Sequence, residues 1–314
     1  MRTLAALIIT ALILIPITSS ASDIVTMPSG WDKARGELNA GSIGGISLSL
    51  SNDSLLDNIS VNIENFPTIV ETYTATWCEN CVSTEHARDE AIADYNVSII
   101  HYHRHYYETE DPFGSNSTES RWESNYGATS AAITGLKRAA PTTVFDGERM
   151  HVGASPRSDS MKNDFIYSLN VQSSAPLLGS ILLSMKPLQS NISNYSNIEF
   201  SWQTSQLTNS CMSNCPNTIS IFPWLLFVEE VAYYPEGSND LEYYNHILHE
   251  AISLGMTDGS MVIDIPIAWD GDDMTAILLV DWIEEEVNNS LPAANILLTL
   301  MTFLVSSVVY VKKN

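Results

Sequence analysis

Four cysteines carry the chemistry that this sequence suggests most clearly, and they fall into two close pairs. Cys78 and Cys81 follow a β-rich stretch at residues 69–74, and Cys81 begins a stretch of helical composition at residues 81–94. This order predicts Cys78 at the N-terminus of a helix, where free N–H groups and the helix dipole lower the pKa of a thiol. Cys78 could then attack a disulfide of another protein, and Cys81 could resolve the mixed disulfide. The carboxylate of Glu79, between the two cysteines, opposes part of the effect of the helix.

The second pair, Cys211 and Cys215, lies in a polar loop before Pro216. In an exported chain, two cysteines this close more often form a disulfide than bind zinc. We therefore expect a structural disulfide between them. The alternative is a second redox pair that exchanges with Cys78, although no junction of strand and helix marks this pair as reactive.

A proline strand follows the first pair along the chain. Pro141 begins a β-branched stretch that ends in an Asp-Gly turn at residues 146–147. Together with Trp77-Cys78-x-x-Cys81, this stretch resembles the thioredoxin superfamily. The resemblance implies that Pro141 is cis and lies beside the reactive disulfide. It also implies that Trp77, Ala140 and Pro141 bind substrate, and it shows a departure, because Thr72 stands where thioredoxin has a buried acid.

The elements expected between and after these motifs define the fold class. Residues 97–107 predict a strand, residues 117–126, 128–137 and 158–169 predict helices, and residues 151–154 predict an edge strand, which gives the order β-α-β-α-β-β-α. Residues 175–287 predict at least five strands with turns between them, and one short helix at residues 243–254. We therefore expect an α/β thioredoxin-like fold followed by an antiparallel β-sandwich domain, with a C-terminal transmembrane helix. The domains are residues 61–172 and 175–287, preceded by an N-terminal segment at residues 22–60.

This two-part arrangement also resembles a family of thioredoxin-like proteins named after a bacterial outer-membrane lipoprotein. The resemblance covers roughly residues 65–285 and is looser in its second half. It rests on Glu71, Tyr73, Thr74, the Cys78–Cys81 motif, His103, Asp111-Pro112-Phe113 and Arg121. This family is poorly defined in function, so it implies architecture more than substrate.

The two ends of the chain predict export and membrane attachment. Residues 1–21 have a short basic start, an apolar stretch and small residues before a cleavage site, as in a signal peptide. Residues 292–311 are long and apolar enough for a single membrane span, and Lys312 and Lys313 follow on the expected cytoplasmic side. We expect a single-pass protein of the cell membrane with an extracytoplasmic N-terminal ectodomain.

The charge of the chain excludes one class of partner. Lys and Arg number 14 against 37 Asp and Glu, so the net charge is −23. Removing Arg2, Lys312 and Lys313 leaves an ectodomain with a charge of 11 − 37 = −26. Such a chain repels phosphate backbones, so nucleic-acid binding is not expected. Seven N-x-S/T sequons also predict a glycoprotein.

Three histidines, His101, His103 and His105, alternate along the strand predicted at residues 97–107. Alternate residues of a strand share one face, and this spacing suits a metal such as Zn²⁺ or Cu²⁺. The favoured interpretation is a polar edge of the substrate cleft. We therefore assign no metal and no cofactor.

The function expected from these patterns is that of a membrane-anchored extracytoplasmic thiol-disulfide oxidoreductase, with Cys78 as nucleophile and Cys81 as resolving cysteine. Its partners would be exported client proteins with thiols or disulfides and a membrane or extracytoplasmic redox partner. One alternative is a surface binding or structural protein with a static disulfide. Another is a copper-handling protein that uses the thiolates with the His101–His105 strand.

Overall fold

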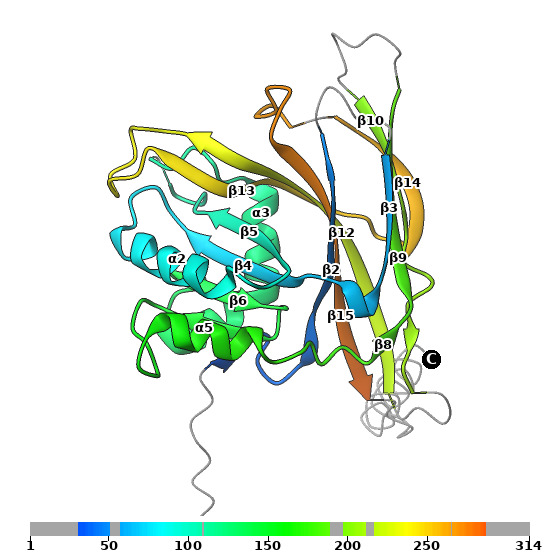
Figure 1. The fold of residues 1–314 in the computed structure, drawn as a ribbon, viewed down its shortest axis with the longest axis horizontal. Helices are drawn as coiled ribbons and strands as arrows, with labels where there is room; N and C mark the ends of the chain where they lie inside the picture. Colours follow the sequence, from blue (N-terminus) through cyan, green and yellow to red (C-terminus); the bar gives the residue numbers. More distant parts are fainter. Residues whose placement is uncertain are drawn as a thin grey trace, which may run out of the picture.

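The structure is a computed structural model, and it describes residues 31–50, 57–108, 110–188, 197–211, 217–264 and 266–286. Of these residues, 46% lie in strands and 19% in helices. The strands form a nine-stranded, a four-stranded and a two-stranded sheet. Figure 1 shows the larger sheets beside each other, with helices covering only one part of the nine-stranded sheet.

The nine-stranded sheet is mixed and takes strands from three separate stretches of the chain. Its parallel pairs are β4 with β5 and β5 with β13, and its other neighbours are antiparallel. Its strands, in spatial order, are β1 (Asp32–Lys33), β7 (Arg149–Val152), β6 (Thr142–Phe145), β4 (Thr68–Thr74), β5 (Val97–His103), β13 (Tyr243–Ser253), β12 (Asn217–Tyr233), β15 (Met274–Glu286) and β2 (Asn39–Ser49).

The four-stranded sheet packs against the β12, β15 and β2 part of the large sheet. Buried apolar side chains from both sheets, such as Phe200 of β10 and Phe227 of β12, form one core between them. The sheet consists of β14 (Asp258–Asp264), β10 (Asn197–Gln203), β9 (Ser180–Pro187) and β3 (Asp57–Asn62), and the two-stranded sheet of β8 (Leu177–Leu178) and β11 (Thr208–Asn209). Alternate residues of β9 and β10 are buried, as expected for strands that cover a core on one face.

The helices cover both faces of the large sheet around β4 and β5. Figure 1 shows α2 (Glu79–Ile92) and α5 (Met161–Leu169) on one face and α3 (Asn116–Trp122) on the other. A π-helical turn, η2 (Glu123–Gly127), joins α3 to α4 (Ala128–Thr134), and a short 3-10 turn, η1 (Ile63–Asn65), precedes β4. Ser115 caps α3 and Ser160 caps α5, since each side chain accepts a hydrogen bond from the first turn.

The predicted fold class, an α/β thioredoxin-like fold followed by an antiparallel β-sandwich domain, is wrong. The described chain is mostly sheet, and one large mixed sheet runs through both halves. The physical reason is the pairing of β13 with β5, which covers a strand edge that would otherwise stay open. β2 and β3 also come from the N-terminal segment and complete the two packed sheets.

Residues 243–254 are another correction, because the predicted helix is strand β13. At the ends of the chain, the predicted signal peptide at residues 1–21 and the predicted membrane span at residues 292–311 lie outside the described residues. Among the helices of the described ranges, none combines the length and the apolar character that crossing a bilayer requires.

Candidate functional site

A disulfide between Cys78 and Cys81 lies at the start of α2. Cys78 is the N-cap residue of this helix, and Cys81 lies in its first turn, with 5.3 Å between the two Cα atoms. Strand β4 ends at Thr74, so four residues connect the strand to the helix. The first-turn N–H groups of a helix stabilise an anion, and a thiolate at Cys78 would occupy this position.

Cys78 and Cys81 differ only slightly in solvent exposure. Cys78 is 6% exposed and Cys81 is 1% exposed, so both are buried. Cys78 is therefore not freely exposed, although it is the more accessible of the two. Ala75 completes the small buried cluster around the disulfide, and Trp77 and Ala140 pack against it half-buried.

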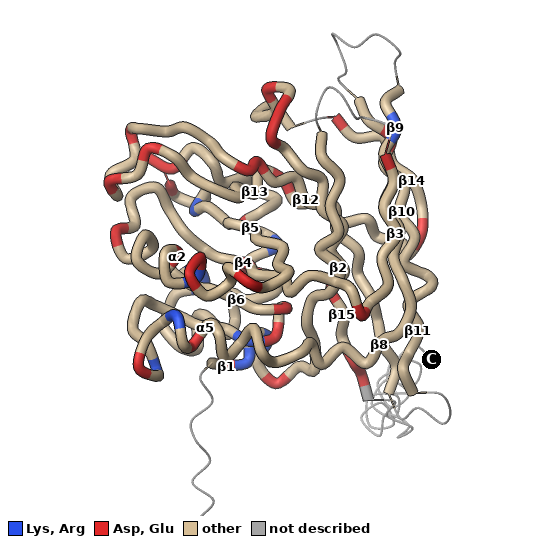
Figure 2. Tube along the Cα trace, in the orientation of Figure 1, with Lys and Arg blue, Asp and Glu red and all other residues tan. Residues whose placement is uncertain are grey.

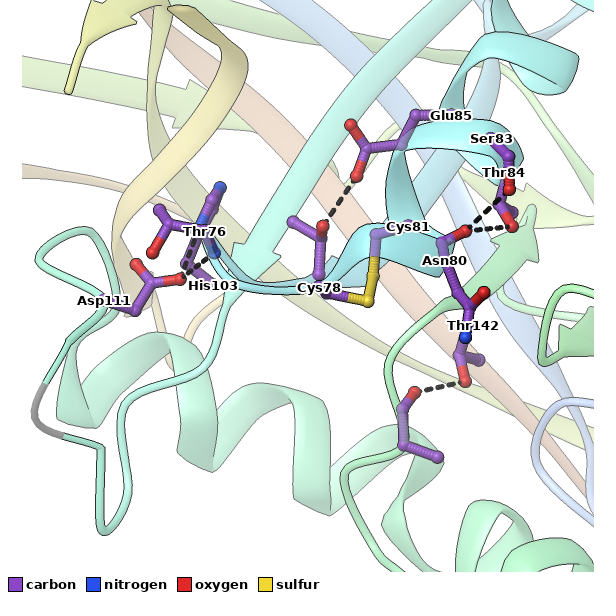
Figure 3. The surroundings of a disulfide bond; sticks show 12 residues. Thr76, Cys78, Asn80, Cys81, Ser83, Thr84, Glu85, His103, Asp111 and Thr142 are labelled. Atoms are coloured by element: carbon purple, nitrogen blue, oxygen red, sulfur yellow. Dashed lines mark hydrogen bonds and ion pairs between the residues drawn. A yellow bond between two sulfur atoms is a disulfide. The ribbon is translucent and has the colours of Figure 1, made fainter. Parts of the chain in front are cut away.

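The loop before β6 approaches the disulfide. The peptide bond between Ala140 and Pro141 is cis, as the family resemblance implied. Ala140 packs against the two cysteines. The hydroxyl of Thr142, the first residue of β6, donates a 2.6 Å hydrogen bond back to the carbonyl of Ala139 and so holds the loop closed. Figure 3 shows Thr142 on the sulfur side of the motif.

Trp77 is held by residues of the loop that follows β5. Its indole Nε1 donates a 2.9 Å hydrogen bond to the carboxylate of Glu108. The guanidinium of Arg104 lies 5.5 Å from the centre of the Trp77 ring, which is cation–π distance. The indole is therefore held beside the disulfide, where it can shield the two sulfur atoms or contact a substrate.

Thr76, two positions before Cys78, forms hydrogen bonds through both its backbone N–H and its backbone carbonyl. Its N–H donates to Oδ2 of Asp111 at 2.8 Å, and the same Oδ2 lies 2.9 Å from Nδ1 of His103 (Figure 3). Its carbonyl accepts from the N–H of Ser238 at 3.0 Å and from the hydroxyl of Tyr244 at 3.3 Å. The start of the cysteine motif is thus attached both to the first half of the chain and to the turn between β12 and β13.

Sequence reasoning missed this second attachment, because it placed residues 243–254 on a helix. Burial, with a smaller effect from Asp111 and Glu85, raises the pKa of the Tyr244 phenol to about 12. The hydroxyl therefore stays protonated and donates hydrogen bonds at neutral pH. Gly237 lies so close to Tyr244 that a Cβ at this position would be 2.0 Å from its hydroxyl oxygen.

Thr72 and Glu71 face opposite sides of the sheet, as expected for neighbours on a strand. The hydroxyl of Thr72 accepts a 3.2 Å hydrogen bond from Arg88 of α2, which is 1% exposed. The guanidinium of Arg88 also contacts Nε2 of His101 and the carboxylate of Asp89. The position behind the cysteine helix therefore holds a buried arginine instead of a buried acid, and burial and Arg88 lower the pKa of His101 well below its usual value.

Glu71 belongs to a buried network on the α3 side. Its carboxylate accepts hydrogen bonds from the hydroxyls of Tyr102 and Tyr126 and lies 3.3 Å from the guanidinium of Arg121. Arg121 in turn pairs with Asp281 of β15, so the network connects the two halves of the chain. These contacts hold the sheet together below the site.

The three histidines do not form one cluster. His101 contacts Arg88 and His103 contacts Asp111, while His105 lies beyond the end of β5. Within the described ranges, no group of three or more His, Cys, Asp or Glu side chains is arranged to hold a metal ion. His101 and His103 instead line a cavity of about 200 Å³ between α2 and β13.

The second cysteine pair is only partly described. Cys211 is disulfide-bonded, and Cys215 lies outside the described residues. The assignment of a structural disulfide between them stays a prediction.

Comparisons with known proteins found similarity to solved structures at low sequence identity. No family model matches the sequence, and no curated protein matches it. The crystal structure of protein AGR_C_4864 from Agrobacterium tumefaciens is similar, with a TM-score of 0.37 and 14% identity over 71% of this chain and 96% of that chain. HBP35 of Porphyromonas gingivalis is similar with a TM-score of 0.40 and 14% identity, over 73% of this chain and 77% of that chain.

Proposed function

We propose that the protein is an extracytoplasmic thiol-disulfide oxidoreductase that acts through Cys78 and Cys81. The observation that carries this proposal is the disulfide at the N-terminus of α2, against which the Ala140–Pro141 loop packs. A disulfide that served stability alone would gain little here, because it closes a loop of very few residues and loop entropy grows with loop length.

The reaction needs no group besides the two thiols and a client disulfide. In the reduced protein, the Cys78 thiolate attacks one client sulfur, the client S–S bond breaks, and one client thiolate leaves. The Cys81 thiolate then attacks the Cys78 sulfur, restores the Cys78–Cys81 disulfide and releases the second client thiolate. Two electrons pass to the client, and the reverse sequence oxidises a client dithiol.

The surrounding residues have distinct roles in this proposal. The helix N-terminus stabilises the Cys78 thiolate, and the hydrogen bonds to Thr76 fix the approach of the chain to it. Trp77, Ala140 and Pro141 form the surface against which a client segment lies. The partners are exported client proteins with thiols or disulfides, together with a membrane or extracytoplasmic redox partner, and the protein is anchored at the cell membrane.

Trapping of mixed disulfides tests the proposal. Cys81→Ser removes the resolving thiol, so clients attacked by Cys78 should remain covalently attached and be released by dithiothreitol. Cys78→Ser is the matched control and should trap nothing. A redox titration of the protein gives the second readout, and a potential above about −300 mV is expected for a pair that exchanges with clients.

The alternative is a surface protein in which Cys78–Cys81 is a static disulfide. The low exposure of both cysteines favours it. A potential well below about −300 mV together with no trapped client would establish this alternative and overturn the proposed activity.

A further inference from the structure

The hairpin of β12 and β13 presents an exposed apolar face beside the cysteine helix. We call this face the hairpin surface and define it by Val231, Tyr233, Tyr243 and Asn245. Val231 is opposite Asn245 and Tyr233 is opposite Tyr243 in the antiparallel register. The three apolar side chains are 45%, 60% and 60% exposed, and the two tyrosine rings lie 5.1 Å apart.

The opposite face of the same hairpin is part of the core, which shows that the exposure is confined to one side. Ala232, Tyr244 and Ile247 are buried in a cluster with Phe113. A strand pair that buries one face needs polar residues on its outer face to stay soluble, but two aromatic rings and a valine stand there instead. Exposed aromatic residues of this kind mark binding surfaces.

A cavity joins the hairpin surface to α2. The cavity of about 200 Å³ is lined by Tyr243 and Asn245 from the hairpin, by Glu85 and Asp89 from α2, and by His103. His103 is 1% exposed, and its Nε2 has no hydrogen-bond partner although Nδ1 contacts Asp111. The walls of the cavity therefore offer two carboxylates and an imidazole nitrogen, while Asp89 also pairs with Arg88.

The part of the chain that forms the hairpin surface is strongly acidic. The sequence contains no Lys or Arg between Lys186 and Lys312, but it contains 16 Asp and Glu there. Figure 2 shows acidic positions along the hairpin and its turn. Those of the hairpin are Glu229, Glu230, Glu236, Asp240, Glu242 and Glu250.

We propose that the hairpin surface and its cavity bind a client segment in which a Lys or Arg adjoins an aromatic or aliphatic residue. The cationic side chain enters the cavity between the carboxylates of Glu85 and Asp89, and its neighbour packs on Tyr233 and Tyr243. A tyrosine face also attracts a cation directly. This proposal rests on the proposed oxidoreductase activity and names the substrate class that the same site selects.

The position of the turn connects this surface with the disulfide. The N–H of Ser238, in the turn between β12 and β13, donates to the carbonyl of Thr76, two residues before Cys78. A client segment on the hairpin surface therefore lies along one side of α2. The client residues that follow this segment then reach the cysteines.

Binding of a cysteine-free peptide tests the proposal separately from the redox chemistry. A fluorescent peptide with alternating Lys and Leu residues should bind the oxidised protein, and the same peptide with Glu in place of Lys should not. Tyr233→Ser with Tyr243→Ser should weaken binding roughly tenfold, and Glu85→Gln roughly threefold. Val262→Ser is the control, because Val262 is 51% exposed on the other sheet.

The possible outcomes distinguish failure of the hairpin proposal from failure of the redox proposal. Equal binding of the Lys and Glu peptides, which needs no variant and so does not depend on folding, overturns the hairpin proposal even if Cys81→Ser traps clients. Unchanged affinity of a folded double tyrosine variant also overturns it. Failure of Cys81→Ser to trap clients, with peptide binding as expected, instead overturns the redox activity and leaves a binding surface.

Discussion

Replacing Asp281 by Asn should destabilise the protein strongly, because this carboxylate joins buried cations from distant parts of the chain. Asp281 is 3% exposed. Its carboxylate lies 2.7 Å from the guanidinium of Arg35 and pairs with Arg121 of α3. It also accepts hydrogen bonds from Ser42 at 2.7 Å and from Asn125 at 3.2 Å. β15 is thereby tied to β2, to α3 and to the segment after β1.

The expected magnitude follows from what Asp281→Asn leaves behind. Arg121 keeps the carboxylate of Glu71 at 3.3 Å, but Arg35 keeps only the hydroxyl of Ser42 at 2.8 Å and the face of Tyr126. Leaving a buried charge without its partner costs about 3–5 kcal/mol. We therefore expect the free energy of unfolding to fall by about 3–5 kcal/mol, a large share of the roughly 5–15 kcal/mol typical of a folded protein.

The pH dependence of this loss has a definite sign. Burial opposes the charge of Asp281, but Arg121 and Arg35 together hold its pKa well below the usual value of 3.8. A depressed carboxyl pKa stabilises the fold above the unfolded pKa, and this stability is lost as the pH falls towards the folded pKa. The difference between the native protein and the variant should be constant from about pH 5 to 8 and shrink below about pH 4.

Urea unfolding, followed by tryptophan fluorescence, measures the loss. Glu236→Gln removes the same charge from an exposed turn and should change stability by no more than about 0.5 kcal/mol. Adding Arg35→Met to Asp281→Asn should recover part of the loss, since it removes the cation that lacks a partner. A loss below about 1 kcal/mol, or no recovery in the double variant, would refute the reasoning.

Two further predictions concern a buried acid and a turn glycine. Burial raises the pKa of Asp146 to about 6 from 3.8, against the opposing charge of Arg149. Its ionisation therefore costs stability as the pH rises from about 4 to 7, by up to about 3 kcal/mol at 1.36 kcal/mol per pKa unit, and Asp146→Asn should remove this cost. Urea unfolding of both proteins across this range checks it, and a pH-independent difference would contradict it. Gly237→Ala should lower stability by about 1–3 kcal/mol, because the new Cβ would lie 2.0 Å from the Tyr244 hydroxyl oxygen and 3.0 Å from the Thr76 carbonyl oxygen. Thermal unfolding measures it, with Gly127→Ala as the control, whose Cβ has no neighbour nearer than 3.4 Å; equal melting temperatures for the two variants would contradict the reasoning.

The elements that carry the cysteine motif could be predicted because their signals are local. β4 is β-branched and is followed by a cysteine motif with good helix formers, and β6 begins directly after a proline. A strand, a helix start and a proline turn each depend on residues within a few positions of one another. These signals predicted which residues surround the disulfide without predicting the sheet in which they lie.

β13 was mistaken for a helix because two irregularities alter the spacing of its buried residues. Tyr244, Ile247, Leu248 and Ala251 are buried at intervals of three, one and three, which is the spacing of a helix face. In the strand, His246 has a φ of +56°, and the register with β12 shifts at a β-bulge. Both features interrupt the alternation of two that marks a strand.

The single sheet could not be predicted for a different reason, since it depends on a contact between distant segments. β13 meets β5 through one parallel pair, Ile247 with His101. The apolar pattern of each segment is ordinary by itself, and no residue in either segment indicates that the two strands pair. Only the folded chain shows that the hairpin of β12 and β13 extends the sheet of β4 and β5.

This pairing changes how the second half of the chain relates to the disulfide. If β13 were absent from the edge of β5, the N–H of Ser238 and the hydroxyl of Tyr244 would not reach the Thr76 carbonyl. Asp111 would then hold the Thr76 peptide from one side only. The hairpin also carries the exposed tyrosine pair, so the element that completes the support of the cysteine loop is the one that we propose binds a client. A mere spacer would need neither feature, which favours the proposal that the second half works together with the disulfide.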